Sequence, residues 1–239
     1  MKSTLGSRIE SVLTALGNTP GVAGYLGRRL HERVFDWRYG VDTGGRIDAC
    51  KLDGAGEHRL NSRGYDAIQI PLFMRMMSSL RVDPARFAFV DLGSGKGRAI
   101  MLAARSRFKH VVGVELSPEL HEIASRNVKT LRRRCRQPMS NELRCQDVIH
   151  WRIPDEDMVC LLYNPFDEVV MAKMVQRFEA WRMDHPERRL LLLYRNARHA
   201  RLIAESRVFA SLVVTRDYHV FEAPVGKQDA LRDERECGQ

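Results

Sequence analysis

Short apolar runs alternate with longer stretches of helical periodicity from Arg86 onward. Seven of these runs have the length and the apolar content of buried strands: FAFVDL (87–92), HVVGVEL (110–116), ELRCQDV (142–148), MVCLLYN (158–164), RLLLLYR (189–195), SLVVTRDY (211–218) and HVFEAP (219–224). Helical stretches separate the first five runs, and no helix separates the last two. The pattern predicts an α/β fold with a mostly parallel sheet, covered on both faces, and a C-terminal hairpin that adds an antiparallel strand.

The first eighty residues lack this alternation. Residues 7–17 and 25–40 have helix-like spacing, and the glycine- and acid-rich stretch 41–64 predicts a loop or a lid. Residues 65–80 return to a helical pattern, with Pro71 near the first turn. The predicted units are a helical and loop extension (1–80), a main domain (81–225) and a polar tail (226–239).

Composition narrows the class of protein. The 239 residues include 44% hydrophobic residues, enough for a sizeable core, and no stretch is long and apolar enough to span a membrane. The five cysteines form no CxxC pair and no regular framework, which favours a reducing compartment without structural zinc. We therefore expect a cytoplasmic protein with no metal site and no membrane partner.

The net charge of +9 raises the question of nucleic acid. Most of the charge is dispersed, and the two dense stretches are LRRRCR (131–136) and YRNARHAR (194–201). A solvated helix end and an ordinary surface explain both stretches, and a basic surface would also suit an acidic protein partner. Nucleic acid stays open as a partner on this evidence.

The stretch VDLGSGKGR (90–98) places three alternating glycines directly after an apolar run. A phosphate-binding P-loop needs Ser or Thr after Gly-Lys, whereas Gly97 follows Lys96 here. The dinucleotide fingerprint needs a small residue where Arg98 stands. The remaining pattern, D-x-G-x-G-x-G, is filled by Asp91, Gly93, Gly95 and Gly97.

This pattern resembles motif I of class I S-adenosylmethionine-dependent methyltransferases, and the resemblance covers about residues 86–223. It implies their Rossmann-like seven-stranded fold and S-adenosyl-L-methionine as the cofactor. In that family the glycines admit the methionine and ribose part of the cofactor, and the acid at the position of Asp91 contacts its amino-acid end. An acid beside a bare backbone turn suits a cationic ligand that lacks a pyrophosphate.

Two further acids stand where the same family binds its cofactor. Glu115 ends the second predicted strand, and it matches the acid that accepts hydrogen bonds from the ribose hydroxyls. The following Ser117 and Pro118 predict the start of a helix. Asp147 ends the third strand and matches the position that binds the adenine amino group in many relatives, with a plain loop acid as the alternative.

The chemical end of the site is predicted after the fourth strand, at Asn164, Pro165 and Phe166. The stretch resembles motif IV of amino-group methyltransferases, except that it has one proline in place of two. It is also similar to the Dot-one type of histone lysine methyltransferases, and RGYDAIQIPLF (63–73) resembles the small lysine methyltransferases that modify the ATP-synthase c-subunit. This resemblance implies that Tyr65 is a lid residue over the cofactor, with packing at a helix start as the alternative.

These resemblances together imply N-methylation of a protein lysine or another amino group by in-line transfer. Asn164 would orient the acceptor nitrogen, and Phe166 would pack against it and exclude water. Two alternatives remain open at this point: a methyltransferase acting on nucleic acid, and a module that binds S-adenosylmethionine without catalysis.

Overall fold

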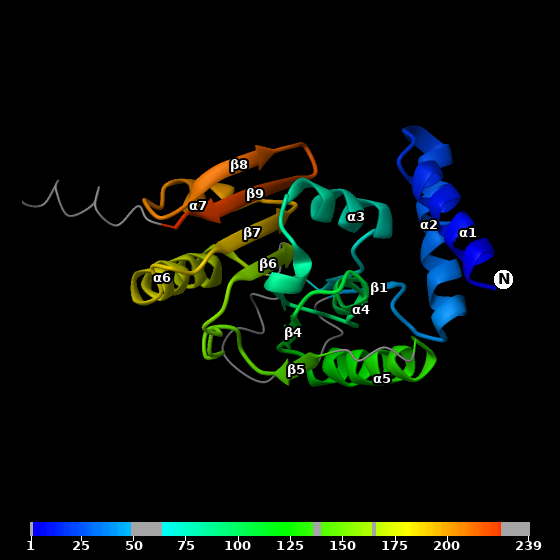
Figure 1. Ribbon diagram of the computed structural model, residues 1–239, viewed down its shortest axis with the longest axis horizontal. Helices are drawn as coiled ribbons and strands as arrows, with labels where there is room; N and C mark the ends of the chain where they lie inside the picture. The colour runs from blue at the N-terminus through cyan, green and yellow to red at the C-terminus, as the bar shows by residue number, and fades with distance from the viewer. Residues whose placement is uncertain (1, 49–63, 136–139, 164–165, 226–239) are drawn as a thin grey trace, which may run out of the picture.

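The computed structural model describes residues 2–48, 64–135, 140–163 and 166–225. Its main sheet has seven strands in the order β5-β4-β3-β6-β7-β9-β8 (Figure 1). The strands are β3 (Ala88–Leu92), β4 (His110–Glu115), β5 (Asn141–Cys145), β6 (Met158–Tyr163), β7 (Leu190–Arg195), β8 (Ala210–Val214) and β9 (Tyr218–Ala223). The first five are parallel, and β9 runs antiparallel to both β7 and β8. The predicted fold, with its antiparallel C-terminal hairpin, is confirmed.

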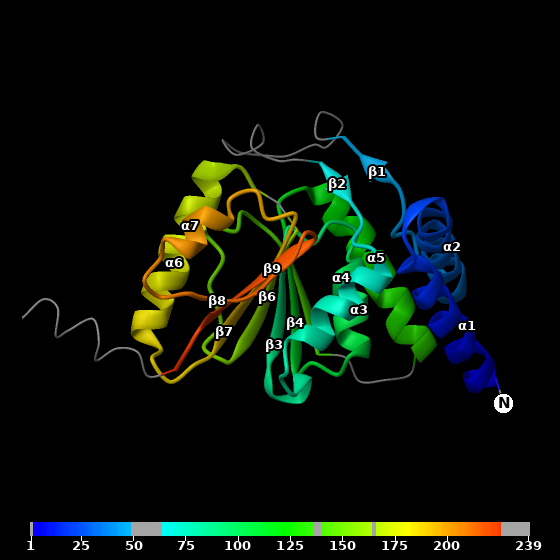
Figure 2. The same cartoon turned by 90° about the horizontal axis from the view of Figure 1, so that it is seen from above.

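Helices cover both faces of this sheet (Figure 2). The helices are α1 (Lys2–Gly17), α2 (Gly21–Tyr39), α3 (Ile70–Ser79), α4 (Arg98–Arg105), α5 (Pro118–Cys135), α6 (Glu168–Asp184) and α7 (Ala200–Ala204). The buried residues of α3, α4 and α5 pack on one face, and those of α6 and α7 pack on the other. Alternate strand residues supply the two cores, so Phe89 joins the first and Val90 the second.

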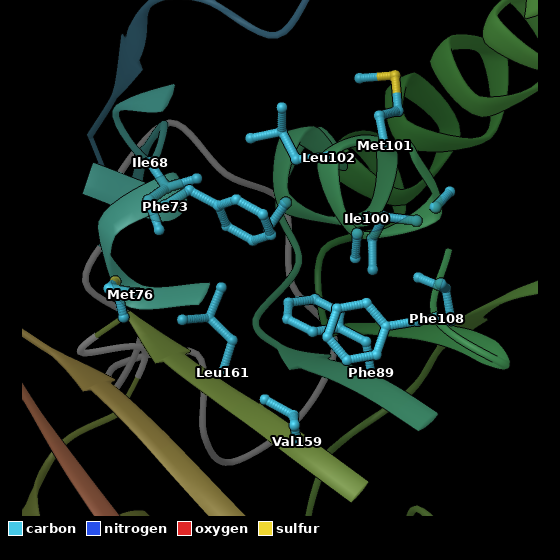
Figure 3. Packing of buried hydrophobic residues seen from close by; sticks show 14 of the residues in the cluster. Ile68, Phe73, Met76, Phe89, Ile100, Met101, Leu102, Phe108, Val159 and Leu161 are labelled. Atoms are coloured by element: carbon cyan, nitrogen blue, oxygen red, sulfur yellow. The ribbon is translucent and has the colours of Figure 1, made fainter. Parts of the chain in front are cut away.

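Aromatic contacts pack α3 and the segment that follows α4 on the first face of the sheet (Figure 3). The ring of Phe73 meets the ring of Phe89 at a centroid distance of 5.8 Å, and Phe89 meets Phe108 at 5.2 Å. Edge-on and tilted geometries of this kind are favourable between aromatic rings. The buried residues of α4 join the same cluster, and α4 begins at the glycine-rich turn.

The N-terminal segment forms a helical hairpin beyond this layer, and a short β-hairpin follows it. Helices α1 and α2 pack on each other and contact α3, and α2 also contacts α5. Gly40 ends α2 in the left-handed conformation, with φ of 62°. Strand β1 (Arg46–Ile47) then pairs with β2 (Tyr65–Asp66). The division of the chain at residue 80 stays a prediction.

Some local predictions were wrong. Strand β5 ends at Cys145, two residues before Asp147, and residues 149–157, where a helix was expected, form turns, bends and irregular structure. The second helical stretch was expected from residue 25, whereas α2 already begins at Gly21. The core of the predicted lid (49–63) and the polar tail (226–239) lie outside the described residues. Among the described helices, none is long and apolar enough to cross a membrane, and the cytoplasmic location stays a prediction.

Candidate active site

The carboxyl ends of the five parallel strands bring polar residues to one edge of the sheet. Glu115 is the last residue of β4, and Asp91 is the last but one of the neighbouring β3. Tyr163 ends β6 on the other side of β3 and pairs with Arg195 at the end of β7. This edge is where open α/β sheets bind their ligands.

The glycine turn connects β3 to α4 with backbone that favours glycine. The φ angles of Gly93, Gly95 and Gly97 are 84°, 53° and 82°. The amides of Gly93 and Ser94 donate to the carbonyl oxygen of Val114 at 2.8 and 3.0 Å, which ties the turn to β4. At Gly97, a Cβ would lie 3.2 Å from that of Ala124 in α5, so this glycine serves close packing.

The carboxylate of Glu115 is held by backbone amides. Its Oε2 accepts from the amide of Gly95 at 2.7 Å, and its Oε1 accepts from the amide of Ser117 at 2.9 Å. Burial raises the pKa of Glu115, and these two amide donors oppose the rise. Each carboxylate oxygen can accept a second hydrogen bond. The arrangement therefore fits a diol, which would present one hydroxyl to each oxygen.

The carboxyl group of Asp91 has a different environment. It is buried, and burial together with the neighbouring Glu115 raises its pKa well above the ordinary value. A buried acid of this kind is stabilised in its charged form by a cationic ligand. It fits the ammonium group of an amino acid.

These residues share one cavity of about 520 Å³. Its walls include seven of the predicted site residues: Tyr65, Asp91, Gly93, Gly95, Glu115, Asp147 and Phe166. Gly97 is not among the lining residues, because it starts α4 behind the turn. Asp147 also caps its own turn, since its Oδ1 accepts from the amide of Ile149 at 2.9 Å. Asn164 and Pro165 lie outside the described residues.

Tyr65 lies against the glycine turn. A Cβ on Gly95 would stand 2.3 Å from its ring, so only glycine leaves room for this side chain. The hydroxyl of Tyr65 donates to the carbonyl oxygen of Thr43 at 2.7 Å, and burial raises the pKa of the phenol. The β1–β2 hairpin therefore covers the turn with an aromatic ring, and the role of Tyr65 as a lid over the cofactor stays a prediction.

The N-terminal segment is fastened to the glycine turn by two basic residues that the sequence analysis did not single out as site residues. Lys96 Nζ lies 3.1 Å from the carboxylate of Asp42 and donates to the carbonyl oxygen of Gly44 at 2.9 Å. Arg98 is buried, and its Nε donates to Thr43 Oγ1 at 2.8 Å. The sequence signal for this contact was Arg98, a bulky cation at the position where the dinucleotide fingerprint has a small residue.

Arg98 has a further donor that faces no partner. Its Nη1 donates to the carbonyl oxygen of Ile68 at 3.1 Å and lies 3.4 Å from Glu32 Oε1. Its Nη2 is buried without a hydrogen bond among the described residues. Arg98 lines the cavity, so the carboxylate of a bound amino acid is a group that could satisfy this donor.

The β6–β7 side of the cavity contains residues that sequence reasoning missed. Tyr163 donates to Asp66 Oδ2 at 3.0 Å, and burial with the neighbouring Asp66 raises the pKa of Tyr163 to about 12. The guanidinium of Arg195 lies 5.6 Å from the centre of the Tyr163 ring. Asn196, with φ of 51°, and Arg198 complete this wall directly after β7. Their position after a buried strand was the signal that could have identified them.

Comparison with known families accounts for this arrangement. Residues 58–146 match the family model described as "Histone methylation protein DOT1". The matched segment contains Tyr65, the glycine turn, Glu115 and strand β5. The chain is a class I S-adenosylmethionine-dependent methyltransferase.

One solved methyltransferase structure reaches a TM-score of 0.50 and has a similar fold. The precorrin-6y C5,15-methyltransferase of Geobacter metallireducens aligns at 12% identity with a TM-score of 0.50, covering 75% of this chain and 97% of that one. An RNA methyltransferase of Salinibacter ruber, solved with S-adenosyl-L-homocysteine, aligns at 18% identity with a TM-score of 0.46, covering 68% and 95%. No curated protein gives a significant match. At these identities the likeness concerns the fold.

The cavity suits the cofactor of this methyltransferase. The carboxylate oxygens of Glu115 fit the ribose hydroxyls. Asp91 fits the ammonium group of the methionine part, and the buried Nη2 of Arg98, which has no partner among the described residues, fits its carboxylate. Within the described residues, no three His, Cys, Asp or Glu side chains gather as metal ligands. S-adenosyl-L-methionine is the cofactor of this methyltransferase.

Proposed function

We propose that this methyltransferase acts on an amino nitrogen and that its acceptor is a lysine side chain of a protein. The observation that carries the proposal is the DOT1 match over residues 58–146. The described part of this segment lines the cavity with Tyr65, the glycine turn and Glu115, where we place the cofactor. The sequence Asn164-Pro165-Phe166 also supports the proposal, and Phe166 lines the same cavity.

When bound, S-adenosylmethionine supplies a methyl group on a positively charged sulfur. In the proposed site Glu115 and Asp91 hold the ribose and ammonium ends, and Asp147 holds the adenine. Tyr65 covers the glycine turn, where its ring excludes water. The protein's main task is alignment in a desolvated slot, which accounts for large rate effects in transfer reactions.

The β6–β7 wall supplies the acceptor side in this proposal. Phe166 lines the cavity and packs partly against the core, so it can position a long aliphatic side chain. We propose that Asn164 accepts a hydrogen bond from the acceptor nitrogen. A lysine amine must lose a proton before it can attack, and burial beside a cation lowers its pKa. The pair of Asp66 and Tyr163 stands at the same wall and can receive a cationic amine as it arrives.

Nucleic acid is the second candidate acceptor. Arg46 and Arg198 are exposed and line the cavity, and both could contact phosphate groups. The experiment must therefore separate the two acceptor classes.

The test follows labelled methyl from S-adenosylmethionine into the protein, nucleic-acid and small-molecule fractions of a cell extract. We expect label in protein that hydrolysis yields as methyllysine, with Asn164→Ala reducing transfer about 100-fold and leaving cofactor affinity unchanged. Leu212→Gln, an exposed change on β8, is the matched control and should transfer normally. Label in nucleic acid would overturn the lysine proposal, as would cofactor binding without transfer to any fraction.

A further inference from the structure

The helical hairpin α1–α2 exposes large hydrophobic side chains that the methyltransferase chemistry does not use. Among the described residues, eight of the fourteen large hydrophobic side chains that are exposed belong to these two helices. Trp37 is 82% exposed and Val22 is 76% exposed. We name this surface the outer hairpin face: Ile9, Val12, Leu16, Val22, Tyr25, Leu26, Leu30 and Trp37.

The outer hairpin face is separate from the surface that packs the hairpin onto the protein. The inner side of α2 buries Gly24, Gly27, His31, Phe35 and Tyr39. The hairpin lies on the far side of the α3–α5 layer from the sheet, away from α6 and α7 (Figures 1 and 2). Exposed patches of this kind mark interaction sites, because soluble surfaces rarely gather so many large apolar groups.

The charges on this side of the hairpin are positive. Arg8, Arg29 and Arg33 are exposed on the same helices. Of the acids in the described part of the hairpin, Glu10 pairs with Arg38 and Arg105.

The two acids of α2 also pair with neighbouring residues. Glu32 lies 3.4 Å from the buried Arg98 as well as 3.7 Å from Arg29. Asp36 accepts from the amides of Thr43 and Gly44. All three acids of the described hairpin are therefore partly buried, and the outer face presents apolar and cationic groups together.

We infer that the outer hairpin face docks on the surface of an anionic lipid bilayer. Trp and Leu side chains insert at the boundary between headgroups and acyl chains, and arginines beside them reach the phosphates. A second copy of this chain would place arginine against arginine, and nucleic acid would leave the apolar groups uncovered. Contact of this kind needs no spanning helix, so the absence of spans, on which the sequence analysis based its expectation of no membrane partner, does not bear on it.

Sedimentation with vesicles tests the inference on the full chain. Vesicles of phosphatidylcholine with one quarter phosphatidylglycerol are compared with vesicles of phosphatidylcholine alone. We expect the protein to bind the anionic vesicles, and Leu26→Gln with Trp37→Gln to weaken binding about tenfold or more. Arg29→Gln with Arg33→Gln should reduce the preference for anionic lipid.

The matched control places the same kind of change on the opposite part of the molecule. Leu212 and Val214 are exposed on β8, so Leu212→Gln with Val214→Thr should leave vesicle binding unchanged. Thermal unfolding and cofactor affinity show that each variant is folded. The inference is overturned if the wild-type protein stays in the supernatant with anionic vesicles. It is also overturned if the β8 control variant weakens vesicle binding as much as Leu26→Gln with Trp37→Gln does. A dimer in light scattering that Leu26→Gln with Trp37→Gln dissociates would overturn it as well.

Discussion

The two halves of the cavity are built in different ways. The half formed by β3, β4 and the glycine turn is buried, and its central carboxylate is held by backbone amides of Gly95 and Ser117. The half formed by β6, β7 and Asp66 is held by contacts between side chains, with Tyr163 donating to the exposed Asp66. A site fixed by backbone is tied to the fold, whereas a site fixed by side chains can change with the acceptor. We therefore assign the first half to the common cofactor and the second to the specific acceptor.

Substitution of Glu115 should have the largest effect on this division. Glu115→Ala removes two acceptor oxygens for the ribose and leaves the amides of Gly95 and Ser117 without their partner. Two charge-assisted hydrogen bonds correspond to about a 100-fold loss of affinity for S-adenosylhomocysteine, measured by calorimetry. Glu119→Ala is the matched control, since Glu119 is exposed in the first turn of α5. An equal loss in both variants would show that general destabilisation causes the effect.

Asp91→Asn should weaken cofactor binding about 30-fold, because a neutral amide loses the attraction to an ammonium group. The same change should alter the pH dependence of the ligand-free protein. The folded pKa of Asp91 lies above its ordinary value of 3.8, so the folded state binds more protons and its stability falls as pH rises through this window. Melting temperatures from pH 4 to 8 should decline less in Asp91→Asn. A steeper decline than in the wild type would contradict the assignment.

Tyr163→Phe probes the acceptor half. The variant keeps the ring beside Arg195 and removes the hydroxyl that donates to Asp66. We expect kcat/KM for the acceptor to fall about tenfold, while the affinity for S-adenosylhomocysteine changes less than about twofold. Steady-state kinetics with each substrate varied in turn separates an effect on the acceptor from an effect on the cofactor. A loss confined to cofactor affinity would move Tyr163 to the other half.

Lys96→Met should have the smallest effect, because its partner Asp42 is 69% exposed at the side chain and water screens the pair. Cofactor affinity should fall about threefold as the hairpin that carries Tyr65 loosens. The control is Lys129→Met, an exposed position on α5. Unchanged affinity would mean that Tyr65 is held by the hydrogen bond to Thr43 without help from Lys96.

The two halves of the cavity also differ in how far the sequence predicts them. The alternation of strands and helices placed Asp91 and Glu115 at one sheet edge, since parallel strands end together, and the positive φ angles agree with the spacing of the glycines. The contact of Tyr163 with Asp66 joins residues 97 positions apart, and local patterns contain no information about such a pair. Arg98 illustrates another limit, because its burial depends on Thr43, Ile68 and Glu32 from the N-terminal segment.

Titration of the purified protein with S-adenosylhomocysteine tests the division of the cavity most directly, with Glu115→Ala and Tyr163→Phe measured alongside. The account predicts one binding site in the wild type, a loss of about 100-fold in Glu115→Ala and wild-type affinity in Tyr163→Phe. Absence of binding to the wild type, or equal losses in the two variants, would contradict it.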